Sequence, residues 1–188
     1  EVVRNIYRRT DTIGVTSRSE AKWLYVPTGY TDYARYGPFR GLGDNFYKKW
    51  QEDLVRCFPN VTTKVHPKDQ SYDGGKIETR LLEECITEYD VLIYDYYSTA
   101  MTIGIFTDKP IIYFDIGSRN MSEEFRRDLK QRIFFCEIDL SGENTEQIAD
   151  FKIAFEQASI EWSNKHLAKY SIADGKNYGF WAPLLEVI

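Results

Sequence analysis

Short, continuously apolar runs recur along this chain and alternate with segments in which apolar residues return at helical spacing. In the strongest run, residues 90–95, four apolar side chains stand between Asp90 and Asp95. Runs without polar alternation are typical of strands that a parallel sheet buries on both faces. The pattern predicts five strands, which cover residues 22–26, 61–65, 90–95, 109–115 and 133–138.

The segments between these runs carry the signals of amphipathic helices. Phe46, Trp50 and Leu54 recur with the helical period, and Ser122 stands where it can cap a charged helix. The predicted helices cover residues 44–57, 76–88, 98–106, 122–132 and 145–163. Strands and helices that alternate in this way indicate an α/β fold with a doubly wound parallel sheet.

The alternating pattern does not reach the two ends of the chain. Residues 1–20 are polar and have no clean period, so we predict a linker or a short docking segment there. Residues 21–170 are predicted to form one domain. The tail, residues 171–188, carries apolar side chains such as Tyr178 and Trp181, and we expect it to pack on a partner half.

Composition and charge narrow the function classes. With 188 residues, 43% of them hydrophobic and 28% charged, the chain fits an ordinary globular domain. A net charge of -5 disfavours nonspecific nucleic-acid binding, and no apolar run approaches the roughly 20 residues of a membrane span.

Three cysteines without Cys-x-x-Cys spacing argue against a disulfide framework or a zinc site and favour a reducing cytosol. With two histidines and no Asp-x-Asp pair, we expect no metal.

Polar side chains stand where the predicted strands end. Open parallel sheets bind ligands outside the carboxyl ends of their strands. In chain order these ends carry Thr28 with Gly29, His66, Asp95 with Ser98 and Thr99, and Asp115. Hydroxyl groups in the first turn of a helix add donors to unpaired backbone N–H groups, and a histidine donates to phosphate oxygens. The strand ends therefore predict a phosphate-binding site.

Each of these residues also has a structural interpretation. Ser98 caps its helix, His66 makes a structural hydrogen bond, Thr28 begins a turn, and Asp95 braces its loop by accepting backbone N–H groups. For Ser98 taken alone, capping is the better interpretation. The combination of several such residues at one edge of the sheet favours a ligand site.

Four segments in the same order resemble a known family. They are Tyr25-Val-Pro-Thr28, Lys64-Val-His-Pro67, residues 90–99 and Lys109-Pro-Ile-Ile-Tyr-Phe114. Together they resemble the C-terminal, donor-binding half of GT-B fold transferases, especially the CDP-glycerol glycerophosphotransferases of teichoic acid synthesis. They are also similar to bacterial capsule transferases that use CMP-sugars, in which a His-Pro motif and a hydroxyl pair bind the donor's phosphates. The resemblance covers residues 22–138 and implies a Rossmann-like sheet, one half of a GT-B fold.

The resemblance implies a role for each residue at the strand ends. It makes His66, Ser98, Thr99 and Thr28 contacts of the donor phosphates, and it gives Gly29, Asp95, Asp115 and Arg40 supporting roles. Two departures from the glycerophosphotransferase pattern bear on the donor. Gly29 and Tyr30 replace an aromatic residue and an arginine, for which Arg35 or Arg40 stands in, and Tyr97 replaces the first serine of an Asp-Tyr-Ser-Ser motif.

The resemblance also implies an activity. It is the transfer of a glycosyl or glycerophosphoryl group from a CDP-, CMP- or UDP-activated donor to a glycan or lipid-linked acceptor, such as a surface polysaccharide or teichoic acid. The transfer reaction would take place in the bacterial cytoplasm or at the inner face of the membrane. It would need no metal or other cofactor. The catalytic base and the acceptor site would lie in an N-terminal half or another subunit. We therefore expect this chain to be a donor-binding half that is inactive alone.

Two other classes stay open. A response-regulator-like domain would use Asp95 as phosphoacceptor, but the acidic residues after the first strand and the lysine after the fifth that its chemistry needs are missing. A structural interaction domain without transferase activity would leave the strand ends unused. Titration with a nucleotide distinguishes these classes.

Overall fold

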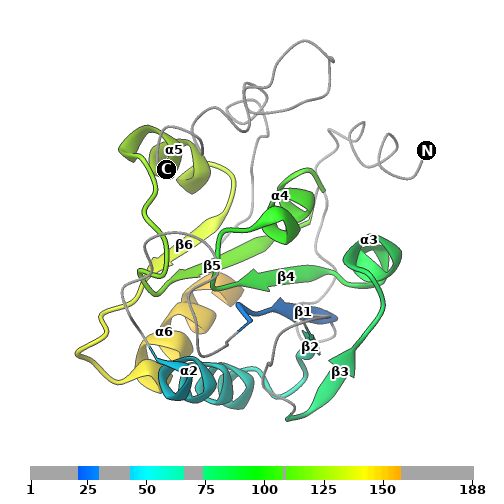
Figure 1. The fold of residues 1–188 in the computed structure, drawn as a ribbon, viewed down its shortest axis with the longest axis horizontal. Helices are drawn as coiled ribbons and strands as arrows, with labels where there is room; N and C mark the ends of the chain where they lie inside the picture. The colour runs from blue at the N-terminus through cyan, green and yellow to red at the C-terminus, as the bar shows by residue number, and fades with distance from the viewer. Residues whose placement is uncertain (1–20, 30–42, 66–73, 108, 158–188) are drawn as a thin grey trace.

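Six parallel strands form the centre of the molecule (Figure 1). The computed structural model describes residues 21–29, 43–65, 74–107 and 109–157. In chain order the strands are β1 (Trp23–Val26), β2 (Thr62–Lys64), β3 (Lys76–Glu78), β4 (Val91–Tyr94), β5 (Ile111–Asp115) and β6 (Phe134–Glu137). They form one sheet in the order β3-β2-β1-β4-β5-β6, and every neighbouring pair is parallel.

Helices cover both faces of this sheet. They are α2 (Asp44–Cys57), α3 (Leu82–Cys85) with the 3₁₀ turn η2 (Ile86–Glu88), α4 (Thr99–Ile105), α5 (Glu123–Lys130) and α6 (Asn144–Gln157). The helices α2 and α6 lie on one face, whereas α3, α4 and α5 lie on the other (Figure 1). The predicted α/β fold with a doubly wound parallel sheet is confirmed.

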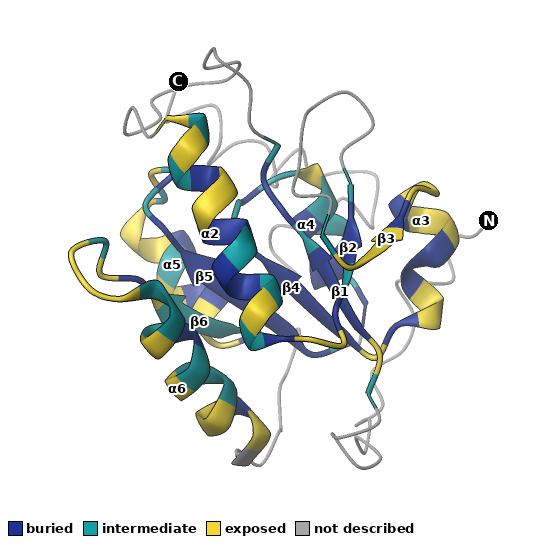
Figure 2. Cartoon of the chain, turned by 90° about the horizontal axis from the view of Figure 1, so that it is seen from below, coloured by how far each residue is buried: buried dark blue, intermediate teal, exposed yellow. Residues whose placement is uncertain are grey.

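The core is divided by the sheet into two apolar clusters. Alternate residues of a strand point to opposite faces, so Leu92 packs with the cluster of α3, α4 and α5, and Ile93 packs with that of α2 and α6. All residues of β4 and β5 are buried, as the dark central strands of Figure 2 show. Burial on both faces is the reason why these strands read as continuous apolar runs.

Most predicted elements agree with the structure to within a few residues. The helix α2 spans the predicted residues, and Ser122 caps α5, where its hydroxyl oxygen accepts a hydrogen bond from Phe125 N at 3.2 Å. The predicted end of the last helix and the two predicted terminal segments lie outside the described residues.

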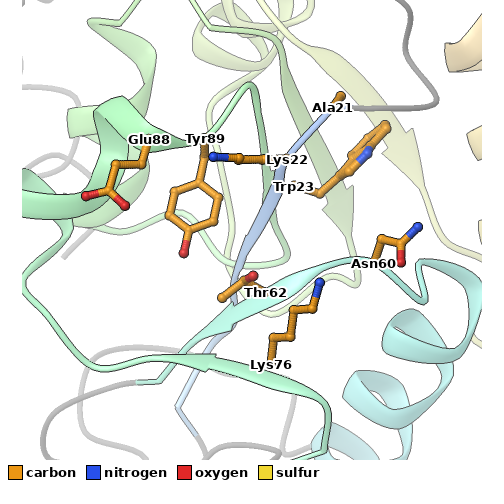
Figure 3. Close-up of a pocket in the computed structure, with 8 residues that line it drawn as sticks. All are labelled: Ala21, Lys22, Trp23, Asn60, Thr62, Lys76, Glu88 and Tyr89. Atoms are coloured by element: carbon orange, nitrogen blue, oxygen red, sulfur yellow. The ribbon is translucent and has the colours of Figure 1, made fainter.

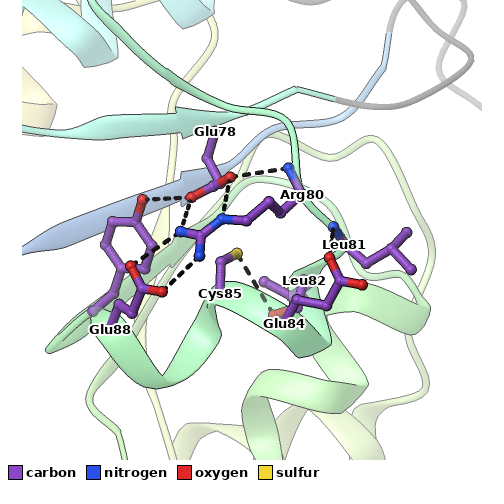
Figure 4. Close-up of polar contacts among 8 residues, drawn as sticks. Glu78, Arg80, Leu81, Leu82, Glu84, Cys85 and Glu88 are labelled. Carbon is purple, nitrogen blue, oxygen red and sulfur yellow. Dashed lines mark hydrogen bonds and ion pairs between the residues drawn. The ribbon is translucent and has the colours of Figure 1, made fainter.

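The predicted helix over residues 76–88 is wrong in its first half, because only residues 82–88 are helical, as α3 and η2. Gly75, with a φ of +86°, turns the chain, and the next three residues pair with β2 as the edge strand β3. The carboxylate of Glu78 then accepts hydrogen bonds from the backbone and the guanidinium of Arg80 (Figure 4). Ile77 and Leu81, which supported a helical period, are 43% and 58% exposed, and only the residues from Leu82 onward turn an apolar side toward the core.

Candidate functional site

The candidate site lies where the order of the strands reverses. From β1 the sheet continues through β2 and β3 on one side and through β4, β5 and β6 on the other. Val26 and Tyr94 are register partners, so the segments that follow β1 and β4 leave the same edge of the sheet side by side. In open α/β sheets, the crevice outside such a topological switch point is where ligands bind.

One buried carboxylate ties the elements of this switch point together. Asp95, fully buried after β4, accepts hydrogen bonds at Oδ1 from Thr28 N (2.7 Å) and at Oδ2 from Trp50 Nε1 (3.0 Å) and the Tyr25 hydroxyl. The donors come from β1, the segment after β1, and α2. Gln51 of α2 adds a second link, because its Nε2 donates to the Thr28 carbonyl at 2.8 Å. The chain around Thr28 is therefore fixed from both sides.

The electrostatics of this cluster follow from its burial. Burial raises the pKa of Asp95 to about 6, and the hydrogen bonds from Tyr25, Thr28 and Trp50 oppose the rise. Burial and the charge of Asp95 raise the pKa of Tyr25 well above its usual range and that of Tyr47 to about 12. At neutral pH Asp95 is therefore an anion that neutral donors surround.

Ser98 and Thr99 lie at the start of α4, as predicted. Ser98 is the N-cap residue, and its backbone carbonyl accepts hydrogen bonds from Thr102 N (3.0 Å) and Thr102 Oγ1 (3.2 Å). Within the described part of the chain, the Ser98 side chain makes no capping hydrogen bond. The capping interpretation therefore does not account for its hydroxyl. Ser98 is half-buried, and Thr99 is exposed.

The other described strand ends are engaged in local contacts. The Thr28 side chain is buried, and its hydroxyl donates to the Gly29 carbonyl at 3.4 Å. Asp115, at the end of β5, accepts from Gly117 N at 2.9 Å and forms an ion pair of 3.0 Å with Arg126 of α5. By accepting a hydrogen bond from Thr28 N, Asp95 braces the segment after β1, in the manner of its predicted structural interpretation. Participation of these three residues in donor binding stays a prediction.

Arg119, in the loop after β5, was missed by the sequence analysis. Its Nη1 donates to the Tyr97 carbonyl at 3.1 Å and the Tyr96 hydroxyl at 3.2 Å, and its guanidinium lies 5.5 Å from the centroid of the Tyr96 ring. The neighbouring Ser118 Oγ is 3.5 Å from the Asp95 carbonyl. The loop after β5 thus holds the loop after β4. The last strand-end residue predicted from the sequence was Asp115, and Arg119 follows it by four residues in the same loop.

Some predicted features lie outside the described residues. They are His66, Arg40, Arg35 and the tail with Tyr178 and Trp181. Among the residues that the structure describes, no group of three or more His, Cys, Asp or Glu side chains has the arrangement of a metal site. In the same described part, no helix is long and apolar enough to cross a lipid bilayer.

A pocket of about 410 Å³ lies at the opposite edge of the sheet, where the strands begin (Figure 3). Its lining consists of Ala21, Lys22, Trp23, Asn60, Thr62, Lys76, Glu88 and Tyr89. None of the predicted site residues is among them. The two edges of the sheet therefore offer separate candidates, and the rule for parallel sheets favours the carboxyl edge.

Comparison with protein-family models, with characterised proteins and with solved structures gives no match to this chain.

Proposed function

We propose that this chain is the donor-nucleotide-binding domain of a GT-B transferase. The donor would be a CDP-, CMP- or UDP-activated glycosyl or glycerophosphoryl compound, and the acceptor a surface polysaccharide or teichoic acid. The observation that carries the proposal is the link between Thr28 and Asp95 across the switch point of a sheet with the order β3-β2-β1-β4-β5-β6. In such sheets this crevice binds nucleotides.

The motifs that resemble the transferase family support the same location. The first motif runs from β1 to Thr28, the third contains β4 and continues to Ser98 and Thr99, and the fourth contains β5. These three motifs thus each include part of a strand, and two of them continue into the segment that leaves the carboxyl edge.

The proposed chemistry is electrostatic. An acceptor hydroxyl attacks the donor, its proton passes to a base in another half or subunit, and the bond to the leaving phosphate breaks. Hydroxyls of Ser98 and Thr99 and the imidazole of His66 would donate to the phosphate oxygens as negative charge accumulates there. Thr28, Gly29 and Asp95 would keep the crevice in shape, and neither a metal nor another cofactor is required.

The response-regulator alternative is weaker on two observations. A phosphoacceptor has to meet its phosphodonor, whereas Asp95 is fully buried and both of its carboxylate oxygens accept hydrogen bonds. The strand order also differs from the 2-1-3-4-5 order of that class. A structural interaction domain remains the second candidate, and it predicts no nucleotide binding.

Calorimetry with CMP, CDP, UMP and UDP tests the proposal. We expect binding of at least one of them, a roughly ten- to hundredfold loss of affinity in His66→Ala, and a smaller loss in Ser98→Ala. Binding should be tighter at pH 6 than at pH 8, because a phosphate stabilises the imidazolium form of His66. EDTA should leave the affinity unchanged. Absence of binding to all four nucleotides would favour the interaction domain.

A further inference from the structure

Arg119 differs from the other described arginines that flank the carboxyl edge. Arg80 pairs with Glu78 and Glu88 at 2.6 Å each, and Arg126 pairs with Asp115 at 3.0 Å. Among the described residues, Arg119 has no carboxylate within ion-pair distance, and its partners are a hydroxyl, a carbonyl and an aromatic ring. Its positive charge is therefore held in place without being neutralised.

The contacts of Arg119 leave one side of its guanidinium open. Nη1 is occupied by Tyr96 and Tyr97, and the face lies against the Tyr96 ring. In the described part of the chain, Nε and Nη2 have no hydrogen-bond partner. These two nitrogens form the edge with which arginine binds a phosphate or carboxylate through two parallel hydrogen bonds.

The position of this open edge is set by the loop after β5. Gly117, with a φ of +70°, turns the chain, and its N–H donates to Asp115 at the strand end. The turn brings Arg119 over the loop after β4, against the peptide that joins Tyr97 to Ser98. Arg119 is a half-buried residue, so it is not sealed inside the core.

We infer that Arg119 binds a phosphate group of the nucleotide donor through its Nε and Nη2 edge. The inference rests on the proposed function and adds a residue that the family resemblance does not assign. It also supplies the cation that the described switch point otherwise lacks, because Asp95 is an anion and Ser98 and Thr99 are neutral. A diphosphate gains more from this cation than a monophosphate does, and a nucleoside gains nothing.

The test is titration calorimetry on the full chain with CDP, UDP, CMP, UMP, the nucleosides cytidine and uridine, and inorganic pyrophosphate. Arg119→Gln removes the charge, and Arg119→Lys keeps the charge but not the two-nitrogen edge. Arg127→Gln is the matched control, because the side chain of this α5 arginine is 70% exposed and lies 4.0 Å from the Asp128 carboxylate. Thermal unfolding of each variant checks that it is folded.

We expect Arg119→Gln to weaken diphosphate binding about ten- to hundredfold, with a smaller loss for monophosphates and none for nucleosides. Arg119→Lys should retain part of the affinity, and it keeps the test usable if Arg119→Gln does not fold. Arg127→Gln should bind like the parent.

Three results would overturn the inference. Equal nucleotide affinity of the parent and Arg119→Gln would refute it while leaving the proposed function intact. An equal loss for nucleosides and nucleotides would mean that Arg119 only positions the loop. If neither nucleotides nor pyrophosphate bind the parent, the inference and the proposed function both fail. Pyrophosphate binding that depends on Arg119, without nucleotide binding, would support the phosphate site and reject the nucleotide donor.

Discussion

Two buried carboxylates at the same edge of the sheet have opposite electrostatic environments. Hydrogen bonds from Arg80 lower the pKa of Glu78, at the end of β3, to about 2 (Figure 4). Burial raises the pKa of Asp95, after β4, to about 6. Its hydrogen-bond partners, a phenol, an indole and a backbone N–H, oppose this rise without reversing it, and among the described residues no cation pairs with the carboxylate.

The difference separates a structural contact from a candidate functional one. A carboxylate that forms an ion pair with a neighbouring arginine stabilises the fold locally. Arg80 joins β3 to η2 in this way, because it pairs with Glu78 and with Glu88. An ionised carboxylate that is buried without a cation is costly, and such groups concentrate at functional sites. The comparison therefore favours the switch point at β1 and β4, rather than the end of β3, as the candidate ligand site.

The largest effect on stability is expected from removing the Asp95 side chain. Asp95→Ala leaves the Tyr25 hydroxyl, the Trp50 indole N–H and the Thr28 N–H buried without an acceptor, and we expect a loss of about 3 to 5 kcal/mol in the free energy of unfolding. Urea denaturation measures it. Glu78→Ala is the comparison variant, and its loss should be smaller because Arg80 and Glu88 remain solvated. A larger loss of unfolding free energy in Glu78→Ala than in Asp95→Ala would contradict this expectation.

The second effect is a dependence of stability on pH with opposite signs for the two carboxylates. The pKa of Asp95 is raised in the folded state, so its contribution to stability is fully present below pH 3.8 and is lost as the pH rises through 6. Between pH 7 and pH 4 the parent should therefore gain about 2 kcal/mol relative to Asp95→Asn. The pKa of Glu78 is lowered, so its contribution is present above pH 4.5 and is lost as the pH falls toward 2.

Denaturation curves of the parent, Asp95→Asn and Glu78→Gln between pH 3 and pH 8 measure both contributions. A free-energy difference between the parent and Asp95→Asn that does not change with pH would refute the raised pKa of Asp95.

A smaller effect is expected from removing one donor to Asp95. Trp50→Phe keeps an aromatic ring beside Phe114, which lies 5.7 Å from Trp50 between ring centroids, and deletes the indole N–H. The loss should be about 1 to 2 kcal/mol in the free energy of unfolding. The pKa of Asp95 should rise further, because the indole donor stabilises its charged form. A pKa of Asp95 that is unchanged or lower, followed by NMR titration of the carboxyl carbon, would show that the indole does not stabilise the anion.

The parts of the molecule that the sequence predicted are those in which one local signal dominates. The strands β4 and β5 are buried on both faces, and Ser122 caps its helix without help from distant residues. The error over residues 76–81 has the opposite cause. Ile77 and Leu81 fit a helical period, but pairing with β2 decides the structure of β3, and that pairing is a tertiary contact.

The candidate site was only partly predictable for the same reason. Asp95 and Ser98 stand at a recognisable strand end, whereas the role of Trp50 as a donor depends on a contact 45 residues away along the chain. Arg119 reaches its carbonyl partner Tyr97 across 22 residues. The opposite pKa shifts of the two carboxylates likewise depend on burial and on neighbours that the folded chain brings together.

The most direct measurement is a titration of the ¹⁵N-labelled chain with CDP and with UDP, followed through its amide chemical shifts. The account predicts that the largest shifts fall on Thr28, Gly29, Ser98 and Thr99 and on the loop of Arg119, at the carboxyl edge of the sheet. The pocket at the opposite edge, with Lys22, Thr62 and Lys76, serves as the internal control and should not respond (Figure 3). Shifts confined to that pocket, or no shifts with either nucleotide, would contradict the central claim.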